Sequence, residues 1–272
     1  MSDTHRVIRR NLTSALIMED DIDWDLRLKD QLRDFALSTR ALIQPLRGSP
    51  NTYADPTYPS PSPDAPVEVP DIDFKSLPDT VEPRTSPYGD GWDLLWIGHC
   101  GLSFPFNTSE RMPKGRVIHE DDVTVPPKKD LWSWNSPFVL VDDYPEHTRA
   151  VSHAQEGLCT LAYAISQAGA RKLLADVALK PPKDAFDFLL RFYCEGTHGR
   201  NYHNCLGLQP ALFHHFKFAG PLSSASDIGN HEGYRDESSS DMIRWSVRLN
   251  VDKLMDGEDD FADQYPDAEE LF

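Results

Sequence analysis

The sequence has few cysteines and no long apolar run, and each shortage excludes a class of protein. Four cysteines among 272 residues are too few for a disulfide scaffold, and no two have the C-x-x-C spacing of a zinc site. No window reaches the roughly 18 apolar residues that cross a bilayer, and the N-terminus lacks the apolar centre of a signal peptide. We therefore expect no structural zinc, no membrane segment and no targeting signal in this chain.

Basic residues are also scarce, with 27 Lys and Arg against 44 Asp and Glu, which gives a formal net charge of -17. Such a surface repels a polyanion, and no run of Lys and Arg offsets the repulsion locally. We therefore expect no nucleic-acid partner. A hydrophobic content of 39% over this length is enough for one core.

Cys194 and Cys205 flank a short loop, EGTHGRNYHN. A disulfide between them is geometrically possible, and a pair of buried free thiols fits the sequence equally well. The sequence leaves these two alternatives open.

Proline divides the sequence, because half of its 22 prolines lie between residues 45 and 87. A segment of this composition has few backbone donors and no periodic apolar pattern, so residues 45–90 are predicted to form a polyproline-like or disordered surface insertion. The remainder of residues 1–250 is expected to form a single domain. Residues 251–272 form an acidic tail whose expected role is solvation.

Short apolar runs alternate with amphipathic segments. Residues 14–18, 93–98 and 159–166 are predicted to be central strands, with a weaker strand at 207–213. Helices are predicted after Trp24, after the capping Ser166, and over residues 185–194. This alternation predicts an α/β fold with a mixed sheet.

The N-terminus is unusual for such a fold. Residues 4–11 have the pattern of a helix end, and they lead directly into residues 14–18, which we expect to be a central strand. A central strand needs a partner on each side, so the sequence predicts an N-terminally incomplete domain whose first strands are missing.

Acidic residues follow the first apolar run in SALIMEDDIDWD, namely Glu19, Asp20, Asp21 and Asp23. Ligands of open α/β sheets bind at the carboxyl ends of strands. Side chains two positions apart point the same way, so Glu19 with Asp21, or Asp21 with Asp23, can reach one cation. Oxygen ligands favour Mg²⁺ or Mn²⁺, which complete their shell with a diphosphate. The alternative is an acidic turn at the start of the following helix.

A second acidic triplet, Glu120-Asp121-Asp122, follows only a short apolar pair and precedes two prolines. This setting predicts an exposed loop whose carboxylates pair with Lys128, Lys129 or solvent. We expect no metal there.

Several motifs occur in a characteristic order: SALIMEDDIDWD, DLLWIGHCG, GLCTLAYAISQAGARKLL, DAFDFLLRFYC and CLGLQPALFHHFKFAGPLSSASDI. Together they resemble glycosyltransferase family 25 in its fungal branch, a family of lipopolysaccharide and procollagen galactosyltransferases. The resemblance implies a GT-A-like, Rossmann-type sheet and inverting transfer of a hexose, with galactose favoured, from a UDP-sugar to a glycan or protein acceptor. It also implies an Mn²⁺ or Mg²⁺ cofactor and a secretory compartment for the full-length form.

The resemblance maps the metal motif of the family onto the first acidic triplet, Glu19-Asp20-Asp21, with Asp23 as its neighbour. Asp21 and Asp23 are expected to bind the metal, and Glu19 and Asp20 the nucleotide-sugar. Arg149 is a further candidate for a phosphate contact, with pairing to a nearby carboxylate as its alternative.

The transfer also needs a general base. Asp187 is favoured and Asp184 is second, because each lies at the start of a helix; the alternative for both is interaction with the helix dipole. His214 or His215 is a candidate extra metal ligand or diphosphate contact, and a surface or satisfied core histidine is the alternative. If the missing strands remove the nucleotide pocket, the chain is instead a non-catalytic binding or structural module.

Overall fold

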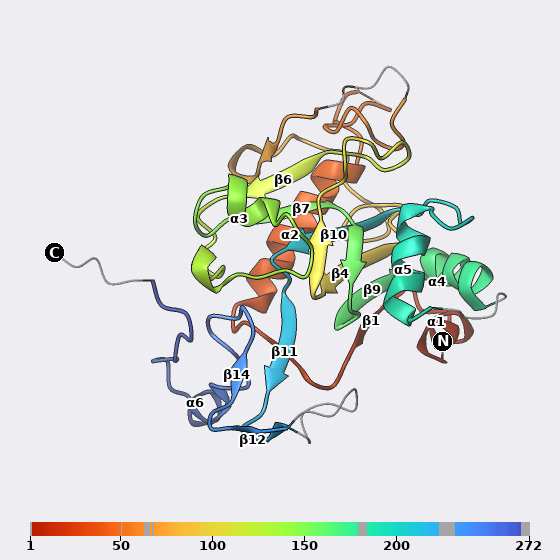
Figure 1. The fold of residues 1–272 in the computed structure, drawn as a ribbon. Coiled ribbons are helices and arrows are strands. Elements are labelled where there is room, and N and C mark those ends of the chain that lie inside the picture. The colour runs from red at the N-terminus through yellow and green to blue at the C-terminus, as the bar shows by residue number, and fades with distance from the viewer. Residues whose placement is uncertain are drawn as a thin grey trace.

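The computed structural model describes residues 2–49, 51–62, 66, 68–178, 184–222 and 232–267, and Figure 1 shows its fold. Ten strands of this part of the chain form one mixed sheet. Seven of them follow the order β1 (Ser14–Met18), β9 (Ala162–Ser166), β4 (Leu94–Gly98), β10 (Cys205–Gln209), β7 (Arg149–His153), β6 (Arg116–His119) and β3 (Ile72–Asp73). Neighbouring strands are parallel in the pairs β4–β10 and β6–β3 and antiparallel in the other four pairs. The predicted α/β fold with a mixed sheet is confirmed.

The central strands are apolar on both faces, and alternate side chains enter two different cores. In β4, Leu95 and Ile97 belong to one buried cluster, whereas Leu94 and Trp96 belong to the other. This division follows from the two-residue period of a strand.

A helix layer covers each face of the sheet. Helix α2 (Leu28–Ile43) places Phe35 and Leu42 in the first cluster, beside β6 and β7. Helices α1 (Ser2–Arg9), α4 (Gln167–Leu173) and α5 (Phe186–Glu195) supply the second cluster and gather next to β1 and β9 (Figure 1). The cap predicted at Ser166 is present, because its Oγ accepts a hydrogen bond from the Gly169 backbone N–H at 2.9 Å.

The sheet continues beyond the ends of the central strands through β11 (Phe213–Lys217), which pairs with β2 (Ile22–Trp24), β4 and β14 (Ser239–Ser240). The predicted strand at 207–213 is therefore two strands, β10 and β11. They are separated at Pro210, which has no backbone N–H to donate to a ladder.

The smaller elements are β5 (Gly101–Ser103), β8 (Gln155–Leu158), β12 (Gly220–Pro221), β13 (Tyr234–Arg235), η1 (Phe74–Ser76), η2 (Lys128–Asp130), α3 (Val139–Asp143), the π-helical η3 (Leu174–Ala178) and α6 (Val251–Asp256).

Strand β1 differs from its prediction, because it lies at an edge of the sheet. Only β9 pairs with it among the described strands. Ala15 and Ile17 pack against the second cluster, but Leu16 and Met18 are 47% and 49% exposed. The prediction of a central strand buried on both faces was wrong, since an apolar run alone does not show which neighbours it has.

The proline-rich segment packs against the sheet where the structure describes it. Asp55 is buried and accepts hydrogen bonds from the backbone N–H groups of Thr57 (2.7 Å) and Gly115 (2.8 Å). Tyr58 packs against the first cluster, and β3 of this segment pairs with β6. Buried side chains thus anchor a segment that was predicted to be a polyproline-like or disordered surface insertion, and most of its described residues are exposed or half-buried; residues 50, 63–65 and 67 lie outside the described part.

The acidic tail also contacts the domain. Asp263 and Asp267 form ion pairs with Arg244, which is 4% exposed, and the Tyr265 hydroxyl donates to the Ser240 carbonyl at 2.9 Å. Solvation is therefore not the only role of the tail, because its described residues, up to residue 267, also bind to the domain. Within the described residues, no helix is both long and apolar enough to span a bilayer.

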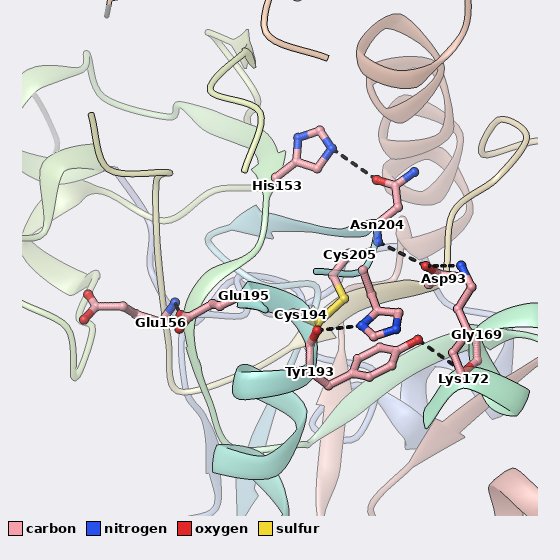
Figure 2. The surroundings of a disulfide bond; sticks show 11 residues. Asp93, His153, Glu156, Gly169, Lys172, Tyr193, Cys194, Glu195, Asn204 and Cys205 are labelled. Carbon is pink, nitrogen blue, oxygen red and sulfur yellow. Dashed lines mark hydrogen bonds and ion pairs between the residues drawn. A yellow bond between two sulfur atoms is a disulfide. The ribbon is translucent and has the colours of Figure 1, made fainter. Parts of the chain in front are cut away.

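All four cysteines are paired. The Cys194–Cys205 bridge joins the end of α5 to the start of β10 (Figure 2). Of the two alternatives that the sequence left open, the structure therefore has the disulfide and not a pair of free thiols. Beside it the Tyr193 and His203 rings stack with centroids 3.8 Å apart, and the Tyr193 hydroxyl donates to the Gly169 carbonyl at 3.2 Å. The second bridge, Cys100–Cys159, was not predicted.

Candidate metal centre

The strands β1, β4 and β10 run in the same direction, so their carboxyl ends lie on the same side of the sheet. Strand β1 is antiparallel to β9 and β9 is antiparallel to β4, so β1 has the same direction as β4 and its parallel neighbour β10. Glu19 follows directly after β1. The first triplet therefore lies where open α/β sheets bind ligands.

Two residues of this region and one from β11 converge. Glu19, Asp21 and His215 each offer a ligand atom, and the three atoms lie within 4.8 Å of one another. The pairing of β11 with β2 positions the imidazole, because His215 lies opposite Ile22 and the Phe216 backbone N–H donates to the Asp21 carbonyl at 2.7 Å.

Glu19 is fixed by the loop between β8 and β9. Its backbone N–H donates to the Leu161 carbonyl at 2.9 Å, and its Oε1 accepts a hydrogen bond from Thr160 at 3.1 Å. The preceding residue, Cys159, is bonded to Cys100 just after β4, and its carbonyl accepts the Trp96 indole N–H at 3.0 Å. The disulfide thus holds the loop that carries Thr160 against the carboxyl end of β4.

This donor set fits a divalent cation. Two carboxylates and one imidazole would supply three ligands, and such a cation commonly fills its other positions with water or a diphosphate. Carboxylate oxygens suit Mg²⁺ and Mn²⁺, whereas an imidazole is a common ligand of Zn²⁺, iron and nickel. The three side chains fit a divalent cation and do not identify which one.

The expected second ligand, Asp23, lies outside this group. It is fully buried within β2, and its carboxylate accepts hydrogen bonds from the Ser240 and Ser246 hydroxyls and from the Trp24 (2.8 Å) and Arg248 (3.2 Å) backbone N–H groups. These donors occupy both carboxylate oxygens. Of the two pairs that the two-residue spacing allowed, the structure brings together Glu19 with Asp21 and not Asp21 with Asp23.

Asp20 is exposed in the turn between β1 and β2, and its carboxylate is not part of the group. Its carbonyl accepts a hydrogen bond from the Arg248 guanidinium at 2.6 Å. Arg248 is a cation near the candidate metal that sequence analysis missed. No local pattern marks it, because only folding brings residue 248 beside residue 20.

Arg149 is occupied elsewhere. It is 6% exposed, its Nε donates to Asp122 at 2.6 Å, and its Nη1 donates to the Pro210 carbonyl at 2.7 Å. The structure thus corrects its proposed phosphate contact: Arg149 forms the carboxylate pair that was the alternative.

The prediction that the second triplet lies in an exposed loop holds for only part of it. Asp122 is buried with Arg149, whereas the exposed Asp121 pairs with Lys75 rather than with Lys128 or Lys129. Neither residue belongs to the cation group found among the described residues.

The two candidate bases differ in their surroundings. One Asp187 oxygen accepts the Cys159 backbone N–H at 3.2 Å, and the other accepts the Phe188 N–H at 2.9 Å. Asp187 therefore lies against the loop that carries Thr160, next to the candidate metal ligands. Asp184 is exposed, directly after the gap in the described residues. Of the two, Asp187 is the one that is held against this loop.

The two adjacent histidines point to opposite faces, as neighbours on a strand do. His215 is half-buried and joins the group, whereas His214 is 2% exposed and lies in the interior near His99. Burial lowers the pKa of His214 to about 3 and that of His99 to about 4, so both imidazoles are neutral at physiological pH.

No family model matches the chain, and neither a curated protein nor a solved structure matches it at a significant level.

Proposed function

We propose that the chain is a metal-dependent glycosyltransferase domain of family 25 with a GT-A-like fold, which transfers a hexose, with galactose favoured, from a UDP-sugar to a glycan or protein acceptor. The observation that carries the proposal is the convergence of Glu19, Asp21 and His215 at the carboxyl end of β1. The order of the sequence motifs supports it. The pairing of all four cysteines supports the secretory compartment, because disulfides persist in oxidising surroundings.

In this proposal each of the candidate residues has a separate role in the transfer. When bound, Mn²⁺ would act as a Lewis acid on the departing diphosphate. Glu19, Asp21 and His215 would hold the cation, and the Arg248 guanidinium would add positive charge nearby. Asp187 would accept the proton as the acceptor hydroxyl oxygen bonds to the anomeric carbon. The bond from that carbon to the diphosphate oxygen breaks with inversion, and UDP leaves with the electron pair.

The alternative function, a non-catalytic binding or structural module, is favoured by one observation. No described strand pairs with the outer edge of β1. On that side of Glu19, therefore, no described strand contributes to a nucleotide-binding pocket. A measurement of UDP binding separates the two functions.

We expect calorimetry to show UDP binding in the presence of Mn²⁺ and none in the presence of a chelator. Asp21→Ala removes one of three candidate ligands and should weaken binding at least about tenfold. The matched control is Asp121→Ala, in the second triplet, whose side chain is 79% exposed.

Asp121→Ala should leave UDP binding unchanged. Equal losses in the two variants would contradict the assignment of the metal ligands. Absence of UDP binding by the unaltered chain with Mn²⁺ present would contradict the transferase and favour the non-catalytic module.

A further inference from the structure

A cavity lies beside Gln209, the last residue of β10, and extends to Arg116 at the start of β6 and to Asp71 just before β3. Its volume is about 850 Å³, within the range of roughly 300–1,000 Å³ that holds small ligands.

The inner part of the cavity is apolar except for one amide. Leu102 and Phe104 are buried in its wall, whereas Phe106 is 42% exposed. Gln209, the last residue of β10, is 3% exposed, and its Nε2 has no hydrogen-bond partner among the described residues. A buried amide without a partner is uncommon and marks a place where a ligand or water supplies one.

The polar part of the lining is held in place by hydrogen bonds. The Glu156 carboxylate accepts hydrogen bonds from the Ser103 hydroxyl at 2.9 Å and from Arg191 at 3.0 Å. Its backbone N–H donates to the Glu195 carboxylate at 2.7 Å, near the Cys194–Cys205 bridge (Figure 2). Glu156 remains partly accessible, with 29% of its side chain exposed, so its oxygens can accept further hydrogen bonds.

The charges around the cavity disfavour an anionic ligand. Four carboxylates face two cations, an excess of two negative charges; the residues are Glu68, Asp71, Asp143 and Glu156 against Lys114 and Arg116. Arg116 is itself paired with Asp71. The carboxylates of the lining therefore suit a ligand that donates several hydrogen bonds and carries no negative charge.

We propose that this cavity binds a neutral saccharide. Saccharide hydroxyls donate to the carboxylates and accept from the Gln209 amide, and the apolar face of a sugar ring packs against the exposed Phe106. The further assignment of this saccharide as the acceptor glycan rests on the proposed transferase function. Binding itself requires neither metal nor UDP.

The test is a titration of the ¹⁵N-labelled full chain with methyl β-D-galactopyranoside, methyl α-D-mannopyranoside and lactose, without metal, and with trilysine as a non-carbohydrate probe. At least one saccharide should shift the side-chain amide resonances of Gln209, identified by their absence from Gln209→Leu. The backbone resonances of Ser103 and Phe106 should shift with them.

Gln209→Leu should weaken saccharide binding about tenfold, because it keeps the volume of the side chain and removes the amide. Phe106→Ala should also weaken binding, and it keeps the test valid if Gln209→Leu does not fold. The matched control is Phe218→Ala, which removes a similarly exposed phenylalanine, 53% against 42%, outside the cavity.

The proposal is overturned if no saccharide shifts these resonances, if the shifts lie away from the cavity, or if only trilysine binds. Failure of Mn²⁺-dependent UDP binding would leave the saccharide result intact and would remove only the acceptor assignment. The two failures are therefore distinguishable.

Discussion

Asp122 and Arg149 form an ion pair that is almost closed to solvent, with side chains 9% and 7% exposed. Burial opposes ionisation of Asp122, but the Arg149 guanidinium and the hydrogen bonds from Thr124 outweigh it and hold its pKa at about 2. Arg149 also donates to the Pro210 carbonyl just after β10. The pair thus ties the loop of the second triplet to the centre of the sheet.

Asp122→Asn should destabilise the chain by roughly 3–5 kcal/mol, because it leaves the Arg149 guanidinium buried without a counter-charge. Urea unfolding at neutral pH measures this loss. The control, Asp121→Asn, changes an exposed residue and should alter the free energy of unfolding by less than about 0.5 kcal/mol. Similar losses in both variants would show that the buried pair contributes nothing specific.

The same pair gives a pH dependence with a definite sign. The pKa of Asp122 in the folded state lies below its ordinary value of 3.8, so the stability that it contributes is present above about pH 4 and is lost as pH falls toward 2. Asp122→Asn should flatten this part of the stability profile.

At the scale of elements, the sequence predicted strands and helix caps that are marked by residues close together in the chain. It did not predict features that depend on contacts with distant segments. Strand β4 lies within the predicted residues 93–98, and Ser166 caps α4 as expected. By contrast, β1 was wrongly expected to be central, because its apolar residues fit an edge as well as an interior. Similarly, the proline-rich segment lacks a periodic pattern, yet single side chains such as Asp55 and Tyr58 anchor it.

Asp55→Ala should lower the free energy of unfolding by at least about 2 kcal/mol, because it leaves the buried Gly115 N–H and the Thr57 groups without their acceptor. The matched control is Asp79→Ala in the same segment. Asp79 pairs with Arg47, but its side chain is 73% exposed, so its removal should cost less than about 1 kcal/mol. Equal, small effects in chemical denaturation would indicate that the segment does not contribute to the core.

At the scale of the whole molecule, the candidate site depends on contacts that cross most of the chain. The first triplet was found from the sequence because its three acids are contiguous and follow an apolar run. His215 was weighed only as an optional ligand, and neither Arg248 nor the Cys100–Cys159 bridge carries a local signal. Spacing rules connect residues a few positions apart, whereas the pairing of β11 with β2 and a disulfide across 59 residues bring distant segments together.

The open edge of β1 has a consequence for how the chain behaves in solution. No described strand pairs with its outer backbone groups, and with Leu16 and Met18 exposed beside them these groups offer a template for another strand. The net charge of -17 keeps two copies apart, but salt shortens the reach of this repulsion from about 30 Å at 0.01 M to about 10 Å at 0.1 M.

Self-association should therefore increase with salt, the reverse of what is expected for a complex held by ion pairs. Sedimentation at the two ionic strengths tests this expectation. Leu16→Lys should suppress the association by placing charge on the edge, whereas Met255→Lys, at an 82% exposed position on α6, should not. Association that weakens with salt, or that both variants suppress equally, would exclude the β1 edge as its cause.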